Sequence, residues 1–484
     1  MARVATGLKR LDEFRWKIEE DYKPGMRVPG IIYANEELMK SIAQDQAVEQ
    51  VANVAMLPGI VKASLAMPDI HWGYGFPIGG VAATSTDDGV ISPGGIGFDV
   101  NCGVRLLRSR LTEEDVRPVL KDLVDQLYVN IPSGVGAKGK IRLDRKGLEK
   151  VAAQGSQWAV SEGYGWHSDL DATESRGKYP GADPTKVGPK PYERGAGQLG
   201  TLGSGNHFLE VEVVDKIYRP NVAAALGLEE GMVTILIHTG SRGFGHQMTT
   251  DYLVVMDRAS KQYGISLPDR QLACAPFSSS EGQDYLAAMA CAANFAWANR
   301  QCITHWTRQA FEQILKKNAE QLGLHVVYDL THNVAKIEDH TINGTRKTLC
   351  IHRKGATRAY PPGHPELPET HKPLGQVVLV PGDMGRYSYV LVGTEKAAED
   401  TFACTCHGAG RMKSRGQAKR DRKARDVMDE LASKGIIIRA ENYATITEEA
   451  PDAYKDAGEV VKVCEGAGIS LRVARLRPIG VVKG

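Results

Sequence analysis

Three features that are scarce or missing narrow the kind of protein that this chain can be. Its 484 residues include only eight cysteines, too few for a secreted scaffold held by disulfides. The longest apolar segment, residues 285–298, contains Asn294 and is shorter than the roughly 20 residues of a membrane helix. The charged N-terminus shows no signal peptide. We therefore expect a cytoplasmic protein with reduced cysteines and no membrane segment.

The sequence also lacks a large net charge, and it has few aromatic side chains. The formal net charge is only +2, so any nucleic-acid partner must be met by a local basic patch. Aromatic residues make up 7% of the chain, which gives no composition signal for base stacking. The apolar fraction of 42% is ordinary for a globular protein with a core.

Hydrophobic periodicity and turn residues predict both helices and strands. Helical patterns cover residues 36–56, 113–128, 144–162, 281–320 and 413–434. Short buried strands are predicted at residues 233–237, 324–328, 348–351 and 377–380. A turn-rich run covers residues 67–103, and a long loop covers 163–200. Because helices and strands are interleaved without regular βαβ units, we expect one large, irregular α+β domain over residues 1–484, with mixed sheets and flanking helices.

Metal-ligand residue types are scattered along the chain, each in a glycine-rich turn. They are Asp99, Cys102, His207, His238 and His332. No pair has zinc-finger spacing, so a site made from them must be assembled by the whole fold. Carboxylate, thiolate and imidazole together suit a borderline divalent ion such as Mn²⁺ or Zn²⁺. For the first pair, a surface aspartate beside a small buried cysteine is the alternative interpretation.

The other histidines differ in their settings. Those without a glycine turn are interpreted as structural or surface residues: His167, His305, His340, His352, His364 and His371. His71 is intermediate, and its neighbour Asp69 is suited to orient a catalytic imidazole. Cys404 and Cys406 suggest zinc, but no second local ligand pair is present to complete a tetrahedral site.

His407 stands directly before Gly408-Ala409-Gly410-Arg411. A histidine in this position can attack phosphorus while backbone amides and the guanidinium hold the phosphate oxygens. The glycine-rich segment 134–140 imitates a phosphate-binding loop, but Ile141 stands where that loop needs Ser or Thr. We interpret it as an ordinary loop.

A basic run follows His407. Between residues 411 and 425 lie Arg411, Lys413, Arg415, Lys419, Arg420, Arg422, Lys423 and Arg425. Two interpretations stay open. Such runs are usually solvated helix faces, whereas a run that begins at a candidate nucleophile can also guide a phosphodiester backbone into the site.

Taken in order, these motifs resemble the RtcB family of GTP-dependent RNA ligases. The resemblance runs from about residue 30 to Lys483 and is carried by residues 67–80, 99–103, 203–210, 238–245, 332–333 and 407–411. It implies the RtcB-like fold and an enzyme that joins RNA 3′-phosphate or 2′,3′-cyclic phosphate ends to 5′-hydroxyl ends. It also implies that His407 becomes guanylylated, that GMP then passes to the RNA 3′ end, and that the enzyme acts in tRNA splicing or RNA repair.

The resemblance also assigns roles to individual residues. One Mn²⁺ would be held by Asp99, Cys102 and His207, and a second by Cys102, His238 and His332, with the Cys102 thiolate as the bridge. GTP, the co-substrate, would be contacted by Asn206, His207, Phe208, Leu209, Glu210, His332, Asn333, Pro381, Gly382, Asp383, Met384, Ser388, His407, Gly408, Ala409, Gly410 and Lys483. The family often has serine where this chain has Asp383, and a carboxylate repels phosphate. RNA and the activator archease are the implied macromolecular partners.

Two other functions use the same residues. A metal-dependent RNA phosphoesterase would employ the ligands with hydroxide as nucleophile, without GTP. A non-catalytic RNA-binding scaffold would rest on the basic run, but binding alone does not need a thiolate at a metal. The Lys-x-Asp-Gly nucleophile of lysine-type nucleotidyltransferases is absent from the sequence, which favours a histidine nucleophile.

Overall fold

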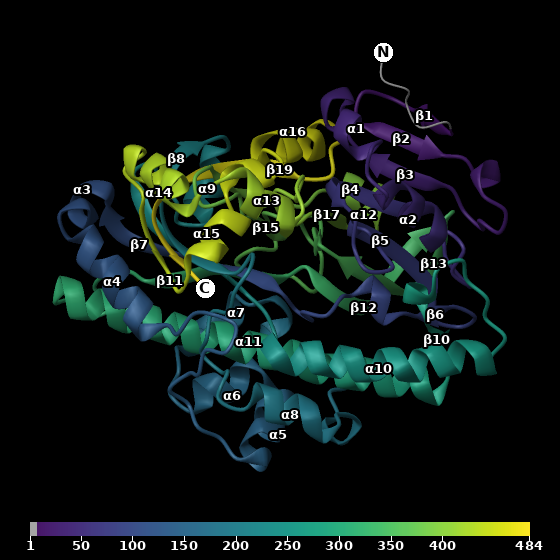
Figure 1. Ribbon diagram of the computed structural model, residues 1–484, viewed down its shortest axis with the longest axis horizontal. Helices are drawn as coiled ribbons and strands as arrows, with labels where there is room; N and C mark the ends of the chain where they lie inside the picture. Colours follow the sequence, from purple (N-terminus) through teal and green to yellow (C-terminus); the bar gives the residue numbers. More distant parts are fainter. Residues whose placement is uncertain (1–6) are drawn as a thin grey trace.

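The fold, seen in a computed structural model that describes residues 7–484, is built on two large mixed sheets (Figure 1). The first contains, in spatial order, β1 (Leu8–Arg10), β2 (Arg15–Ile18), β3 (Gly30–Tyr33), β4 (Ser64–His71), β5 (Ile78–Ser85), β13 (Thr345–Lys354) and β12 (Asn333–Ile342). The second contains β11 (His325–Thr331), β7 (Gly103–Thr112), β9 (Met232–Thr239), β8 (Phe208–Ile217), β19 (Leu471–Lys483), β16 (Ser388–Val392) and β15 (Val377–Val380), with β18 (Ile437–Ala440) beside β19. Two further pairs are β6 (Val90–Ile91) with β10 (Ala275–Pro276), and β14 (Ala356–Arg358) with β17 (Cys404–Cys406).

Helices flank these sheets. They are α1 (Glu36–Ile42), α2 (Ala47–Val54), α3 (Glu113–Val116), α4 (Leu120–Asn130), α5 (Arg145–Gln154), α6 (Ser156–Ser161), α7 (His167–Asp171), α8 (Pro189–Gly195), α9 (Pro220–Ala225), α10 (Arg242–Gln262), α11 (Ser280–Leu315), α12 (Glu395–Thr401), α13 (Arg415–Asp421), α14 (Ala424–Ser433), α15 (Tyr443–Glu448) and α16 (Ala457–Gly466). Mixed sheets with flanking helices confirm the predicted α+β class. That residues 1–484 form one domain stays a prediction.

The longest helix, α11, lies between layers. Figure 1 shows it crossing the molecule below β11 and β12, with α5, α6 and α8 on its other side. Ser279 caps its start by accepting a hydrogen bond from the backbone of Gly282, and Lys316 ends it in the left-handed conformation. Its middle third is buried on all sides, including Asn294, Asn299 and Arg300. A helix buried all round can carry such polar side chains only when each has hydrogen-bond partners.

Several boundaries predicted from sequence are wrong. Residues 163–200 are not a structureless loop, since they include α7 and α8. The run 67–103 contains the end of β4 together with β5 and β6, because apolar residues between its turns pair in sheets. The stretch 413–434 is two helices, which are interrupted at Arg422, a residue in the extended conformation. Residues 36–56 likewise divide into α1 and α2, and residues 144–162 divide at Gly155, which has a positive φ of 59°.

The second sheet brings the predicted ligands together. Four neighbouring strands, β11, β7, β9 and β8, end or begin at the same edge. Gly103 of β7 pairs with Thr331 of β11 and with Thr239 of β9, while Phe208 of β8 pairs with His238. The residues beside these pairs, which include Cys102 and His332, therefore meet at one end of the sheet.

Two further findings bear on the cellular setting. Over residues 7–484, the helices are too short or too polar for any of them to cross a membrane. All eight cysteines lie in this part of the chain, and each is buried and free. This agrees with the prediction that they do not form a disulfide framework.

Candidate active site and metal centre

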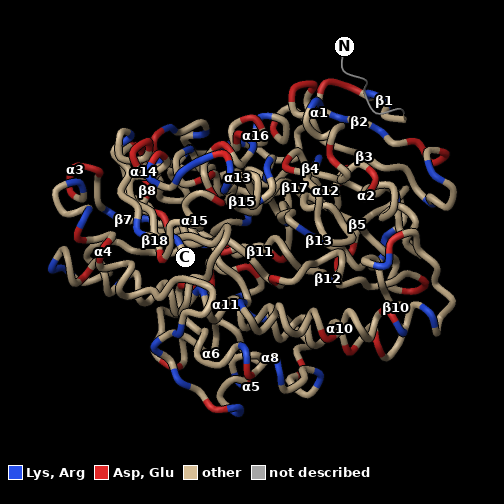
Figure 2. Tube along the Cα trace, viewed as in Figure 1, with Lys and Arg blue, Asp and Glu red and all other residues tan. Residues whose placement is uncertain are grey.

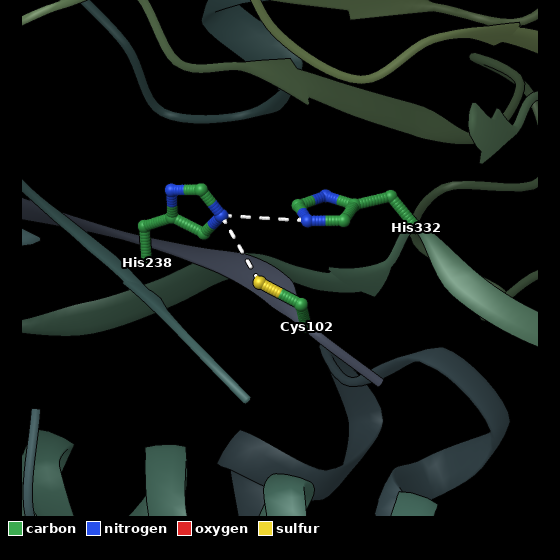
Figure 3. A group of neighbouring side chains, drawn as sticks. All are labelled: Cys102, His238 and His332. Atoms are coloured by element: carbon green, nitrogen blue, oxygen red, sulfur yellow. Dashed lines mark hydrogen bonds between the residues drawn. The ribbon is translucent and has the colours of Figure 1, made fainter. Parts of the chain in front are cut away.

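Two overlapping groups of ligand atoms lie at this end of the second sheet, where the four strands begin or end. One consists of Asp99, Cys102 and His207, and the other of Cys102, His238 and His332; within each group the donor atoms lie within 4.8 Å of one another. Cys102 belongs to both. Figure 3 shows the second group, in which the Nε2 atom of His238 faces the Cys102 sulfur at 3.3 Å and the His332 Nε2 atom at 3.3 Å.

The first group is closed by an aspartate. Asp99 Oδ2 lies 2.8 Å from the Nε2 atom of His207, which is 3.5 Å from the Cys102 sulfur. The opposite nitrogen of His207, Nδ1, lies 3.1 Å from the carbonyl of Leu202. Gly240 permits this approach, because a Cβ atom there would lie 2.5 Å from the Asp99 carboxylate oxygens.

The electrostatics of both groups suit a divalent cation. Burial lowers the pKa of His238 and of His332 well below the usual range, so both rings are neutral donors at neutral pH. Burial, followed by the charge of Asp99, raises the pKa of Cys102, so its thiol needs a nearby cation to lose a proton. Burial opposes ionisation of Asp99, but His207 outweighs it and lowers the pKa to about 2. Nitrogen, sulfur and carboxylate donors fit Mn²⁺ or Zn²⁺.

The candidate nucleophile His407 stands next to the second group, with its ring centroid 4.9 Å from that of His332. Its Nδ1 atom lies 2.6 Å from Asp69 Oδ2, which also accepts hydrogen bonds from the backbone amides of His407 and Gly408. Burial disfavours the charge of Asp69, but the adjacent His407 lowers its pKa. Asp69 therefore orients His407, leaving the Nε2 atom for chemistry.

His71, by contrast, is not oriented by the Asp69 carboxylate. Its Nδ1 atom lies 3.0 Å from the Asp69 backbone carbonyl, and burial lowers its pKa to about 3. The close contact between β4 at Asp69 and the loop after His407 depends on Gly410, which has a φ of 74°. A Cβ atom there would lie 2.2 Å from the Asp69 carbonyl oxygen.

A pocket joins the second ligand group to His407. Its wall contains these predicted residues: Cys102, Asn206, Phe208, His238, His332, Asn333, Pro381, Gly382, Asp383, Met384, His407, Gly408, Ala409, Gly410 and Lys483. Five predicted residues lie behind it: Asp99, His207, Leu209, Glu210 and Ser388. Ser388 accepts a hydrogen bond from the Gly382 amide, whereas Leu209 packs in the core. None of the six histidines interpreted as structural or surface residues lines the pocket.

Four residues of the wall were missed by sequence reasoning: Ile78, Gly355, Glu449 and Tyr454. Ile78 lies in the run 67–80 but was not singled out there, and the other three lie outside the motifs. Glu449 and Tyr454 belong to the ordinary charged and aromatic content of the C-terminal region, and only the tertiary fold brings them to His407. Asn333 supports the wall, since its side chain accepts a hydrogen bond from the Gly355 amide and donates one to the Asp99 carbonyl.

The carboxylate of Asp383 is paired within its own turn, so it would not present a free negative charge to a phosphate in the pocket. Its Oδ2 atom accepts a hydrogen bond from Arg386 Nε at 2.5 Å, and its Oδ1 atom accepts one from the Gly385 amide at 3.1 Å. Arg386 in turn donates to the backbone carbonyls of Pro451, Tyr454 and Lys455. The carboxylate of Asp383 thus ties its turn to the neighbouring loop.

The basic run is largely paired with acids, and Figure 2 shows basic and acidic segments mixed over this part of the trace. Arg411 donates to Glu449 at 3.0 Å. Lys413, Arg415, Lys419, Arg422 and Arg425 also have acidic partners within the described chain. Among residues 7–484, Arg420 and Lys423 form no salt bridge. The run is therefore not an open row of cations.

The segment 134–140 proves to be a loop, as interpreted from the sequence. Its only link to the site among the described residues runs through Gly134, whose carbonyl accepts a hydrogen bond from Arg242 and whose amide donates to Gly203. No strand leads into it and no helix follows its lysines directly, so it lacks the frame of a phosphate-binding loop.

The chain is similar in sequence to known proteins over nearly its whole length. The family described as "tRNA-splicing ligase RtcB" matches residues 50–484. Proteins named tRNA-splicing ligase RtcB are similar over nearly their whole length. The protein of Archaeoglobus fulgidus is 56% identical over 477 residues, and that of Thermococcus kodakarensis is 53% identical over 477 residues, each with 99% of both chains covered. The protein of Aeropyrum pernix is 55% identical over 478 residues, covering 98% of this chain and 99% of the relative.

Proposed function

The chain belongs to the RtcB family, and we propose that it is a GTP- and Mn²⁺-dependent RNA ligase acting on tRNA halves or broken RNA. It would join a 3′-phosphate or 2′,3′-cyclic phosphate end to a 5′-hydroxyl end. The observation that carries this proposal is the position of His407, held at Nδ1 by Asp69 beside a cysteine–histidine ligand group in one pocket. A cytoplasmic location and activation by archease belong to the same proposal.

The first step is transfer of GMP to His407. The Nε2 lone pair attacks the α-phosphorus of GTP, a P–N bond forms, and the bond to the departing pyrophosphate breaks. Asp69 keeps the proton on Nδ1 and balances the positive charge that develops on the ring. The backbone amides of His407 and Gly408 already donate to Asp69, so the amides of Ala409 and Gly410 are the ones that would hold phosphate oxygens.

Two further displacements complete the reaction. An oxygen of the RNA 3′-phosphate attacks the phosphorus on His407, which breaks the P–N bond and leaves guanosine joined to the RNA 3′ end through pyrophosphate. The 5′-hydroxyl of the second RNA, losing its proton, then attacks the 3′-phosphorus and releases GMP. The phosphate of the junction thus comes from the 3′ end.

The metal ions would be held by the two ligand groups, with Cys102 shared between them. When bound, they would neutralise phosphate charge and polarise phosphorus–oxygen bonds. The role of the chain is to supply neutral imidazoles and a thiol in a buried site, so that a cation gains more from these donors than from water. The predicted nucleotide contacts of the pocket wall remain part of the proposal.

Guanine would be selected by polar groups on β8 and β19. Both carboxyl oxygens of Glu210 are buried without a hydrogen-bond partner among the described residues. Lys483 of β19 pairs with Phe208, which lies two residues before Glu210 on β8. An unpaired buried polar group costs about 1–3 kcal/mol, which is enough to reject adenine by roughly tenfold to a hundredfold.

Incubation with α-labelled GTP and Mn²⁺ tests the proposal. The wild type should retain label in a bond that is labile to acid and stable to alkali, as expected of P–N. His407→Ala should retain none, whereas His364→Ala, a histidine outside the pocket, should label normally. RNA cleavage without any label would instead support the phosphoesterase, and RNA binding alone would support the scaffold.

The polarity of joining is tested with RNA labelled in its terminal 3′-phosphate. After ligation and digestion, the label should lie in the junction, and GTP should be preferred over ATP. Label released to solvent, or efficient joining of 5′-phosphate to 3′-hydroxyl ends, would contradict the proposed reaction.

A further inference from the structure

We propose that Asn299 and Arg300, two consecutive residues in the middle of α11, are positioning residues for the metal centre. They do not belong to either ligand group. Their side chains contact the backbone of the turns that carry the ligands, so one helix sets the spacing of the donor atoms. This inference rests on the proposed metal dependence and concerns how the site is built before an ion arrives.

Arg300 joins two of these turns and the strand β11, which leads to His332. One of its terminal nitrogens, Nη1, donates to the carbonyls of Asn101 and Thr239, each at 2.9 Å. The other, Nη2, donates to the side chain of Asn101 and to Asp329, again at 2.9 Å. Asn101 lies between Asp99 and Cys102, Thr239 follows His238, and Asp329 lies three residues before His332. The planar fork of arginine is what allows one side chain to serve all three.

Asn299 fixes the remaining turn. Its Oδ1 atom accepts hydrogen bonds from the amides of Gly200 and Thr201 at 2.7 and 3.1 Å. Its Nδ2 atom donates to the carbonyls of Thr201 and Gly240. Immediately after this segment, the carbonyl of Leu202 holds His207. The backbone that orients His207 and the backbone that follows His238 are therefore tied to the same amide group.

The imidazole rings of His238 and His332 need this support because no hydrogen bond from the described residues holds their second ring nitrogen. Metal-binding histidines usually donate their second ring nitrogen to a carboxylate or carbonyl. The Nδ1 atoms of His238 and His332 are buried and have no such partner among the described residues. Their direction must then come from packing and from the main chain at Thr239 and His332. Arg300 holds the main chain at Thr239 directly, and it reaches the strand that ends before His332 through the side chain of Asp329.

Asn101 adopts a backbone conformation that most residues avoid, and its contacts hold it there. Its φ is 51°, in the left-handed region that costs most residues energy and that asparagine tolerates better than others. Its side chain is fully used, donating to the Ala293 carbonyl and accepting from Arg300. This conformation turns the chain sharply between Asp99 and Cys102, so that both can reach one ion.

Buried polar residues on a helix can also be purely structural, and α11 supplies matched examples. Arg308 is buried and forms two hydrogen bonds with Asp169, at 2.7 Å each. Asn294 donates to Ala152 and accepts from Tyr179. Neither touches a ligand turn. They are controls with the same chemistry, helix and burial.

The test measures Mn²⁺ binding by the full-length protein without GTP, together with thermal unfolding of the metal-free protein. Arg300→Lys and Asn299→Ala should weaken Mn²⁺ binding by about 10- to 100-fold, the usual effect of losing a partner behind the ligands. Arg308→Lys and Asn294→Ala should lower the unfolding temperature by similar amounts but bind Mn²⁺ like the wild type.

Each outcome decides the proposal. Wild-type affinity in both test variants, or equal losses of affinity in the controls, would overturn it and leave α11 with a structural role only. If Arg300→Lys does not fold, the comparison of Asn299→Ala with Asn294→Ala decides. A wild type that binds no Mn²⁺ would contradict the proposed function instead, so the two failures are distinguishable.

Discussion

The pocket has a ligand wall and a charged rim that are built differently. The ligand wall consists of Cys102, His238 and His332, which are neutral, buried and supported from behind by α11. The charged rim consists of Arg411, Arg415 and Glu449, and the Glu449 carboxylate pairs with both guanidinium groups. A cation can bind the first without breaking an ion pair.

A phosphate that approaches the rim meets a different situation. Arg411 donates to Glu449 and to the hydroxyl of Tyr454, each at 3.0 Å. Phosphate must replace these partners, so its net gain is smaller than that of a new charge-assisted hydrogen bond. The difference teaches that the ligand wall is preorganised, whereas the charged rim must exchange one set of partners for another before it can hold a phosphate.

The largest effect is expected from removing the shared ligand. Cys102→Ser should lower the occupancy of both ions, because one sulfur serves both groups, while His238→Ala should lower only one. Metal analysis after exchange into Mn²⁺ measures this. Cys350→Ser, at a buried cysteine of β13 outside both groups, is the control and should keep both ions. Loss of a single ion in Cys102→Ser would mean that the sulfur does not bridge.

A second large effect is expected at Asp69. Asp69→Asn replaces an acceptor of three hydrogen bonds by a group that can also donate, so His407 loses its orientation. Formation of the GMP adduct should slow by about 10²- to 10⁴-fold, in the range of lost acid–base assistance. Mn²⁺ binding should not change, because Asp69 is outside the ligand groups. A parallel loss of metal would show that the ligand wall and His407 are not independent.

The sequence singled out the three residues that the structure brings together in the ligand wall. Cysteine and histidine are scarce in this chain, with eight and 13 among 484 residues, so Cys102, His238 and His332 could be selected one at a time from their glycine-rich turns. Strand ends could also be read from runs such as residues 233–237. How these ends would meet depends on sheet order, and short buried runs do not specify which strands become neighbours.

The rim and the support could not be predicted in this way. Glu449 and Tyr454 are common residue types in an unremarkable segment, and Arg300 looks like any arginine on a long helix. Most ion pairs of the basic run involve acids outside the run, at residues 429–430 and 448–452. Local pattern cannot show that a charge is already compensated by a distant one.

A stability effect of intermediate size is expected at Glu212, a buried carboxyl on β8 behind the pocket. Burial raises its pKa to about 8, above its ordinary 4.5, so the folded state binds the proton more tightly than the unfolded state. Its contribution to stability is therefore complete below about pH 4.5 and is lost as the pH rises toward 8. Glu212→Gln should remove this loss and increase the free energy of unfolding at pH 8–9 by a few kcal/mol.

Thermal or urea unfolding from pH 5 to pH 9 measures the effect. Glu174→Gln is the matched control with the opposite sign. Burial opposes the charge of Glu174, but Lys336 and Arg358 lower its pKa. Replacing this carboxylate by an amide breaks a buried ion pair with Lys336 and should destabilise the protein at neutral pH. If Glu212→Gln shows the pH dependence of the wild type, Glu212 is not the group that titrates.

The smallest effect is expected in the salt dependence of RNA binding. Cations of the basic run without an acidic partner should contribute more to it than cations that are already paired. Arg420 and Lys423 form no salt bridge within residues 7–484, whereas Lys419 pairs with Glu448 and Arg422 with Glu430. If RNA passes along this run, the double variant Arg420→Ala/Lys423→Ala should reduce the slope of log affinity against log salt by about 0.7 for each lost phosphate contact with single-stranded RNA.

The matched variant Lys419→Ala/Arg422→Ala removes the same formal charge but also frees two carboxylates. Its salt slope should change less, because these cations already have partners and release fewer counterions on binding. RNA binding measured between about 50 and 200 mM salt decides, and GMP transfer to His407 should be nearly unchanged in both variants. Equal slopes in both variants and the wild type would identify the run as a solvated face, and the RNA would then have to reach the ligand wall by another route.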